Sequence, residues 1–75
     1  MSWNYRIVQT RGGFELGEVY YDERGEPYAW GEAAVWGDTP EEVQEILDRM
    51  VQGAAKPIID KWKTSPDNAG PEIAT

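Results

Sequence analysis

The sequence contains no cysteine and no histidine among its 75 residues. Without cysteine the chain has no disulfide framework and no thiol nucleophile, and without either residue it lacks the usual zinc ligands. Ser-His-Asp and Cys-His catalytic arrangements are excluded as well, because both need a histidine base. We therefore expect no bound metal ion and no cofactor. Carboxylates, tyrosines and lysines are the main groups left for acid–base chemistry.

Long apolar runs are also missing. The longest uncharged apolar stretch, Ala33 to Trp36, is far shorter than the roughly 20 residues that span a membrane. Residues 1–6 show no apolar segment after a basic start, so they do not predict a secretory signal. We expect a cytoplasmic protein that has no membrane partner.

Basic residues are half as frequent as acidic ones, 7 against 14, which gives a formal net charge of −7. The imbalance is concentrated in residues 14–48, where eleven acids accompany Arg24 alone. Helix capping and turn preference account for part of these carboxylates. Because the charge repels phosphates, we expect no direct binding of nucleic acid. An acidic surface that imitates nucleic acid and blocks a basic partner is an alternative function.

Three segments rich in β-branched and aromatic residues predict a three-stranded antiparallel β-meander, at about residues 3–10, 14–22 and 27–36. Residues 22–26, Asp-Glu-Arg-Gly-Glu, predict a type I turn closed by Gly25 in the left-handed region. In that hairpin we expect Tyr20 to pair with Tyr28 and Val19 with Ala29.

The second of these segments has its apolar residues in two phases. Phe14 and Leu16 share one face of a regular strand, whereas Val19 and Tyr21 share the other. A β-bulge at Gly17–Glu18 would bring all four side chains to one face, and we expect one there.

Thr39 marks the clearest local signal, the start of a helix. It is the expected N-cap, Pro40 occupies the first helical position, and Glu42 completes a capping box. The apolar residues that follow form one stripe: Val43, Ile46, Leu47, Met50 and Val51. The pattern predicts an amphipathic helix over about residues 40–53, packed on one face of the sheet. Gly53 is a plausible end, although Ala54 and Ala55 could continue the helix.

The end of the chain divides into two parts. Residues 57–62 include Ile58, Ile59 and Trp62, and we expect them to dock on the sheet or the helix, as a strand, a helical turn or neither. Residues 64–75 are polar and rich in proline and glycine, which predicts a disordered C-terminal tail. The whole chain thus predicts a single α+β domain over residues 1–63.

Aromatic side chains are concentrated in the predicted strands, since eight of the nine lie between residues 3 and 36. One helix covers one face of a sheet, so some aromatic surface is left over. That surface is either structural, through cross-strand contacts, or an interface, because exposed aromatic patches commonly mark binding sites. We favour a small non-enzymatic protein-interaction module that binds a protein partner or a second copy of itself. The candidate interaction surface comprises Trp3, Tyr5, Glu15, Glu18, Tyr20, Tyr28, Trp30 and Glu32.

Catalysis is the remotest hypothesis. Glu18 and Glu32 lie on neighbouring predicted strands and are the carboxylates best placed to work as an acid–base pair. The pair would need a pocket deep enough to shift a pKa, which so small a domain seldom provides.

Three segments together resemble a group of short bacterial proteins of uncharacterised activity. They are Trp3 to Val8, the hairpin Glu18 to Trp30 (EVYYDERGEPYAW), and the ending Lys56 to Asp60 (KPIID). The resemblance implies a compact β-meander-plus-helix domain made as a free-standing small protein, and it carries no activity to transfer. The residues after Asp60, Trp62 among them, depart from the short ending of that group.

Overall fold

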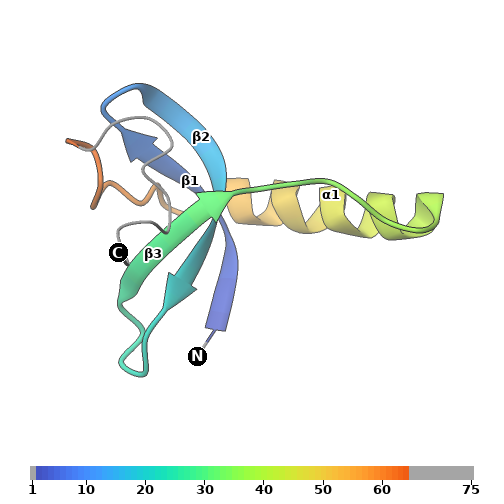
Figure 1. Ribbon diagram of the computed structural model, residues 1–75, viewed down its shortest axis with the longest axis horizontal. Helices are drawn as coiled ribbons and strands as arrows, with labels where there is room; N and C mark the ends of the chain where they lie inside the picture. The colour runs from blue at the N-terminus through green and yellow to red at the C-terminus, as the bar shows by residue number, and fades with distance from the viewer. Residues whose placement is uncertain (1, 65–75) are drawn as a thin grey trace.

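The chain was analysed as a computed structural model that describes residues 2–64. Its elements, in chain order, are β1 (Ser2–Thr10), β2 (Gly13–Tyr21), β3 (Pro27–Glu32) and α1 (Pro40–Ala54) (Figure 1). The strands form one antiparallel sheet in the order β1-β2-β3. The predicted α+β meander with one helix is therefore confirmed. The predicted disordered tail, apart from residue 64, lies outside the described residues.

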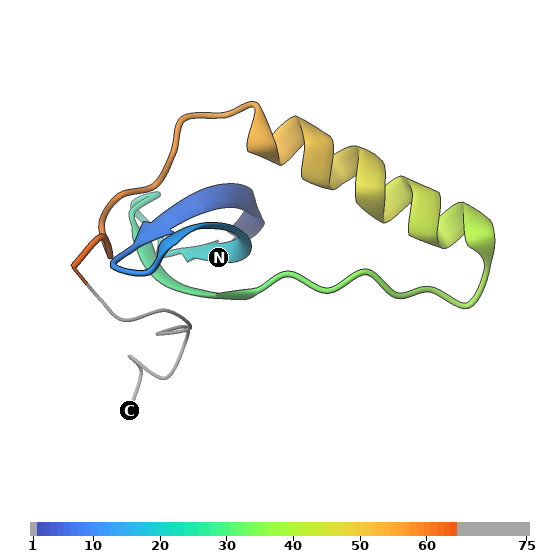
Figure 2. The ribbon, with the colours of Figure 1, turned by 90° about the horizontal axis from the view of Figure 1, so that it is seen from above.

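β3 ends at Glu32, so the prediction of a strand that continues to Trp36 is wrong. The last pair in the ladder is Gly17 with Glu32, after which residues 33–39 lead away from the sheet toward the start of α1 (Figure 2). The segment keeps a strand-like composition but leaves Trp36 71% exposed.

β2 is regular along its length. It pairs with β1 without interruption from Ser2–Tyr21 to Thr10–Gly13, so the bulge predicted at Gly17–Glu18 is wrong. Alternate residues therefore point to opposite faces of the sheet. Leu16 lies on the face that carries α1, and Val19 lies on the other. β2 is apolar in both phases because each of its faces has a neighbour to pack against.

The turn between β2 and β3 has the predicted conformation. The Asp22 amide donates to the Glu26 carbonyl at 2.9 Å, and Gly25 has a φ of 83°. The Asp22 carboxylate accepts from the amides of Arg24 and Glu26, both at 2.9 Å. This local network explains why an acidic residue begins the turn.

Beyond the turn the register differs from the prediction by one residue. A shift between Tyr20 and Tyr21 leaves Tyr28 as an extra residue, so Tyr20 pairs with Ala29 and Val19 with Trp30. The expected Tyr20–Tyr28 and Val19–Ala29 pairs are therefore wrong. The bulge has a clear consequence, because it turns Trp30 to the same face as Val19.

The core lies on the face of the sheet away from α1, which we call the Trp62 face. Val8, Val19 and Trp30 are fully buried there, and Trp62 packs in the same cluster with Ile59 beside it. The Trp30 indole N–H has no hydrogen-bond partner within the described residues. Trp62 is therefore a core residue, although it follows the segments that resemble the short bacterial proteins.

Residues 57–62 dock beside β1 as the sequence predicts, through a single parallel bridge between Ile59 and Val8. The Ile59 amide donates to the Ile7 carbonyl, and the Gln9 amide donates to the Ile59 carbonyl, both at 2.9 Å. The segment is therefore neither a full strand nor a helix.

Side chains from the sheet hold this docked segment in place. Arg6 donates from Nε and Nη2 to the Pro57 carbonyl, and from Nη1 to the Tyr21 hydroxyl at 3.0 Å. Farther along, Lys61 donates from Nζ to the carbonyl of Pro27 at the start of β3. The segment is thus fastened at both sides of the Trp62 face.

α1 begins as predicted. Thr39 Oγ1 accepts from the Glu42 amide at 3.2 Å, and Glu42 Oε1 accepts from the Asp38 amide at 2.7 Å. The helix continues through Gly53 to Ala54, which agrees with the predicted span of about residues 40–53 and with the alternative that Ala54 extends it.

Gly53 instead serves as the contact point with the sheet. A Cβ atom on Gly53 would lie 2.1 Å from the carbonyl oxygen of Tyr5, so only glycine lets the helix lie this close to β1. Met50 and Gly53 are the buried residues of α1. The first half of the helix projects beyond the sheet (Figures 1 and 2).

Candidate functional site

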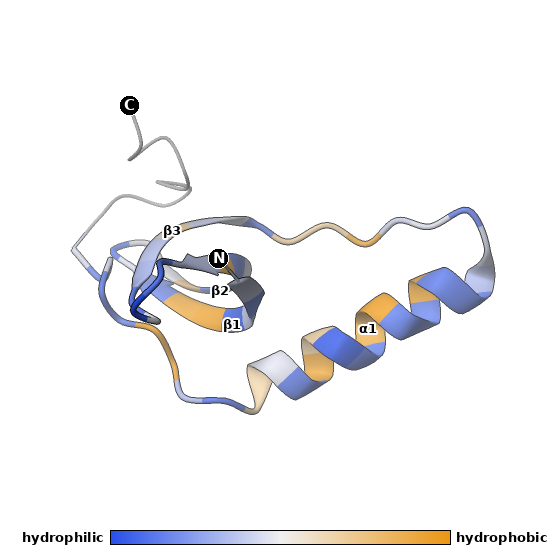
Figure 3. Cartoon of the chain, turned by 90° about the horizontal axis from the view of Figure 1, so that it is seen from below, coloured by the Kyte–Doolittle hydropathy of each residue, from blue (hydrophilic) through white to orange (hydrophobic). Residues whose placement is uncertain are grey.

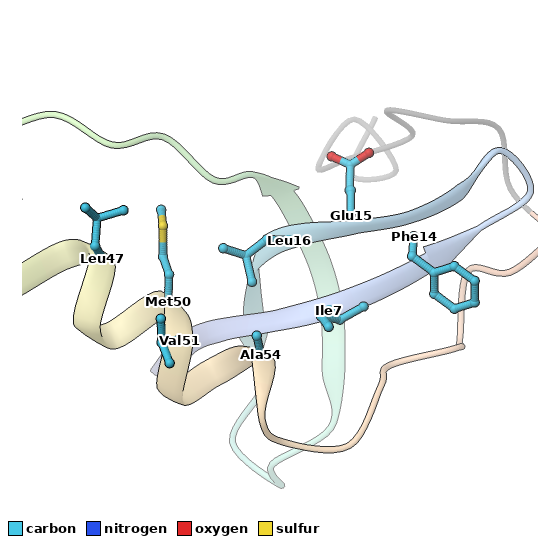
Figure 4. A pocket seen from close by; sticks show the side chains of 8 residues that line it. All are labelled: Ile7, Phe14, Glu15, Leu16, Leu47, Met50, Val51 and Ala54. Carbon is cyan, nitrogen blue, oxygen red and sulfur yellow. The ribbon is translucent and has the colours of Figure 1, made fainter.

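An apolar groove runs between the second half of α1 and the β1–β2 hairpin (Figure 4). We call the face of the sheet that carries it the helix face. The groove has a volume of about 410 Å³. Apart from Glu15 its lining is apolar: Ile7, Phe14 and Leu16 from the strands, and Leu47, Met50, Val51 and Ala54 from the helix.

Large apolar side chains remain exposed along this groove. Phe14 is 62% exposed, Leu47 46% and Val51 70%. Single exposed apolar residues are ordinary, but a contiguous group of them marks an interaction surface. The groove is therefore the strongest candidate site on the described chain.

The geometry of the connection explains why α1 does not cover its own stripe. Residues 33–39, when extended, span about 23 Å, and a helix of the length of α1 spans about 22 Å. The connection therefore carries Thr39 far from the sheet, and the helix uses its whole length to return (Figure 2). Hydrophobic residues follow α1 along this projecting length (Figure 3).

A second, more polar cleft of about 330 Å³ lies between α1 and the first half of β1. Trp3 and Tyr5 line it with their rings edge to face and the ring centroids 5.1 Å apart. Arg49 and Lys56 line it from the helix side. Burial raises the pKa of the Tyr5 hydroxyl, the Glu18 carboxylate adds to the rise, and Arg49 opposes it.

Tyr20 and Glu18 form a hydrogen-bonded pair on the helix face. The Tyr20 hydroxyl donates to Glu18 Oε1 at 2.8 Å. This hydrogen bond is the main cause of a raised pKa for Tyr20, and partial burial adds to it. The hydrogen bond links both side chains on β2, the central strand of the sheet.

The structure divides the predicted interaction surface. Trp30 is fully buried on the Trp62 face and Tyr5 is buried under α1, so neither belongs to a surface. Trp30 is buried because the bulge at Tyr28 turns its side chain to the Trp62 face, and Tyr5 is buried because Gly53 lets α1 lie close to it.

The remaining predicted residues do not form one patch. Trp3 and Tyr28 are exposed, and Tyr20 is half-buried. Glu15 borders the groove, but its carboxylate points away from Ile7 and Phe14 (Figure 4).

The carboxylates proposed as a catalytic pair are not brought together. Glu18 pairs with Gly31, whereas Glu32 pairs with Gly17, so the two side chains point to opposite faces of the sheet. Within residues 2–64 no group of three or more acidic side chains gathers in a way that would hold a metal ion. Over the same residues no helix is long and apolar enough to cross a membrane.

The acidic residues of the middle segment lie in separate places. Those of residues 22–26 form the turn at one end of the sheet, whereas those of residues 38–48 lie on and before the projecting part of α1 (Figure 1). They do not make one continuous row such as a nucleic-acid backbone presents.

Sequence reasoning missed the groove residues Phe14, Leu16, Leu47 and Val51 as a site. The sequence predicts a core-facing helix stripe, but only Met50 of the stripe is fully buried; Val43 and Ile46 are half-buried, and Leu47 and Val51 are exposed. The length of the connection before Thr39 was the available signal, since it sets the start of the helix well away from the sheet. No protein-family model, curated protein or solved structure matches the chain.

Proposed function

We propose that this chain is a small non-enzymatic protein-interaction module and that the groove between α1 and the β1–β2 hairpin is its binding face. The observation that carries the proposal is the exposure of Phe14, Leu47 and Val51 along one apolar lining. Burying such side chains against a partner contributes roughly 25 cal/mol for each Å² of apolar surface removed from water.

The chemistry of the groove defines what it accepts. Among residues 2–64 the lining has no buried polar side chain and one charged side chain, Glu15, whose carboxylate points away from Ile7 and Phe14. It therefore suits aliphatic or aromatic side chains of a protein, which bind by shape and apolar contact, better than a polar metabolite. The exposed aromatic Trp3 lies on the same face of the sheet but lines the second cleft and not the groove.

The separation of Glu18 and Glu32 on opposite faces removes the one acid–base pair that the sequence suggested, and this supports the non-enzymatic part of the proposal. Imitation of nucleic acid has weaker support, because the Asp22 and Glu42 carboxylates are engaged in local hydrogen bonds.

Site-specific photo-crosslinking in expressing cells tests the proposal. A photo-crosslinking amino acid at position 51 should form adducts with protein, because it lies at the groove. The same probe at position 24, exposed in the β2–β3 turn, is the matched control and should form few. Equal yields from both positions, or none from position 51, would contradict the proposal.

A further inference from the structure

We propose that the occupant of the groove is a second copy of this chain, with the two α1 helices packed antiparallel about a two-fold axis at Leu47. The inference rests on the proposed function and names the partner of that same site. Three independent features of the described residues support it.

The first feature is the symmetry of an apolar helix ridge, of which Leu47 and Val51 are exposed and Val43 is half-buried. Leu47 is the central residue of α1, with seven helical residues on either side, and Val43 and Val51 lie one turn away in each direction. Residues four apart form a continuous ridge on a helix surface. A two-fold axis at Leu47 therefore places Leu47 against its own counterpart, and Val43 against Val51 of the second copy. An isologous interface needs this kind of self-complementary surface.

The second feature is that the two halves of α1 are complementary, because one borders an open groove and the other has no strand to pack on. The second half, from Leu47 to Ala54, borders the groove, while the first half projects beyond the sheet with no strand beneath it. Antiparallel packing lays the projecting half of one helix over the groove of the other copy. Each copy then covers Phe14 and Val51 of its partner, and the same contact occurs twice.

The third feature is the distribution of charge along the helix. Residues 38–45 carry four carboxylates and no base, whereas residues 48–56 carry Arg49 and Lys56 against one acid, Asp48. Parallel packing would place the acidic halves side by side. Antiparallel packing places the acidic half of each helix beside the half of the other that carries Arg49 and Lys56, which favours that orientation.

The size of the domain gives the pairing a physical reason. A chain of this length buries little apolar surface by itself, and association with a second copy is a common remedy. Here the chain covers the Trp62 face with its own residues, whereas on the helix face α1 covers Tyr5 and leaves Phe14, Leu47 and Val51 exposed.

Single-cysteine variants test the arrangement directly, because the natural chain contains no cysteine. In a glutathione redox buffer, Leu47→Cys should give a disulfide-linked dimer at about twice the mass of the chain. Val51→Cys alone should not, because antiparallel packing separates its two copies by about 12 Å along the helix axes, beyond the reach of a disulfide. A mixture of Val43→Cys and Val51→Cys chains should form the mixed disulfide. Efficient linkage of Val51→Cys to itself, or failure of Leu47→Cys to link, would overturn the proposal.

Light scattering over a range of concentrations supplies a second test on the unmodified chain. We expect a dimer whose dissociation constant rises at least about 100-fold in Leu47→Glu, because two carboxylates then meet at the axis. Gln52→Glu places the same charge on the same helix, away from the ridge, and should leave the dimer intact. Circular dichroism checks that both variants fold.

The failure of this inference differs from the failure of the proposed function. A purified chain that stays monomeric at millimolar concentration, while a probe at position 51 still crosslinks to another protein, removes the second copy and keeps the binding face. Absence of any adduct at position 51 removes both.

Discussion

On the Trp62 face of the sheet, Val8, Val19 and Trp30 are fully buried beneath a segment that comes from the far end of the described chain. On the helix face, α1 reaches β1 with its last turns only, and Phe14 and Val51 remain mostly exposed. Each of the three strands carries apolar residues on both sides, so their presence alone does not distinguish the faces. What distinguishes them is whether the chain supplies its own cover. The first face holds the fold together, and the second is available to a partner.

Removing the cover of the Trp62 face should have the largest effect. Trp62→Ala should lower the free energy of unfolding by about 3–5 kcal/mol, because it opens a cavity beside Trp30. A domain of this size has little more stability than that, so the variant should be largely unfolded at 25 °C. Urea denaturation followed by circular dichroism measures the effect. Trp36→Ala removes an equally large but exposed side chain and should cost within about 0.5 kcal/mol, and similar losses in both variants would refute the distinction.

Adding one methyl group to each face should give the next largest effect. A Cβ on Gly17 would lie 2.7 Å from Trp30 Cε3 and 3.1 Å from the Gly31 carbonyl oxygen. Gly17→Ala should therefore lower the free energy of unfolding by about 1–3 kcal/mol, as overpacked cores do.

Gly53→Ala is the matched variant for the helix face. The added Cβ should push α1 away from β1 and lower the free energy of unfolding. The better helix propensity of alanine should offset about 0.5–1 kcal/mol of this loss. Near-ultraviolet circular dichroism should show the tryptophan signal of the core altered in Gly17→Ala and retained in Gly53→Ala. The reverse result would mean that the helix contact, and not the Trp62 face, organises the core.

A smaller effect on the free energy of unfolding is expected at alkaline pH, where the hydrogen bond between Tyr20 and Glu18 on the helix face is tested. Because the folded pKa of Tyr20 is raised above its ordinary value of 10.0, folding favours the protonated hydroxyl. The stabilisation is complete below the unfolded pKa, at about pH 10, and is lost as the pH rises through the higher folded pKa. The free energy of unfolding of the natural chain should thus fall more steeply above pH 10 than that of Tyr20→Phe. Tyr5, whose pKa is also raised, keeps part of the slope in the variant, and identical slopes would rule out the Tyr20–Glu18 contribution.

The smallest effect on stability is expected at Val51, although its effect on association should be large. Val51→Ser should change the free energy of unfolding by about 0.5 kcal/mol or less at low protein concentration, since the side chain is exposed. Self-association should weaken about tenfold or more in the same variant, because two copies of the valine leave the interface. Dilution-dependent light scattering and urea denaturation give the two values. A strongly destabilised Val51→Ser would place this residue in the core instead.

Local signals in the sequence predicted the parts of the fold that local chemistry determines. The helix start at Thr39 and the turn around Gly25 were predictable because each is set by side chains within a few residues. The bulge at Tyr28 was not, because it depends on which face needs a large side chain, and that is decided by Trp62 from across the molecule.

The candidate site was only partly predictable for a related reason. An amphipathic stripe shows that Leu47 and Val51 need apolar neighbours, but it does not show whether those neighbours belong to the same chain. The aromatics of the sheet were easier to notice, yet two of them, Tyr5 and Trp30, are structural. The exposure of a side chain depends on the path of the connection between residues 33 and 39, which periodicity does not encode.

The docking of Ile59 between the Ile7 carbonyl and the Gln9 amide sets an order of events during synthesis. A growing chain emerges from its first residue onward, so the two hairpins are complete before their cover exists. Until residue 62 is available, the indole of Trp30 remains in water, and closing the contact to Val8 brings together residues some fifty positions apart. The nascent sheet should therefore be most exposed to aggregation and proteolysis after α1 has emerged and before residues 57–62 dock, and a chain cut short after α1 should keep that exposure.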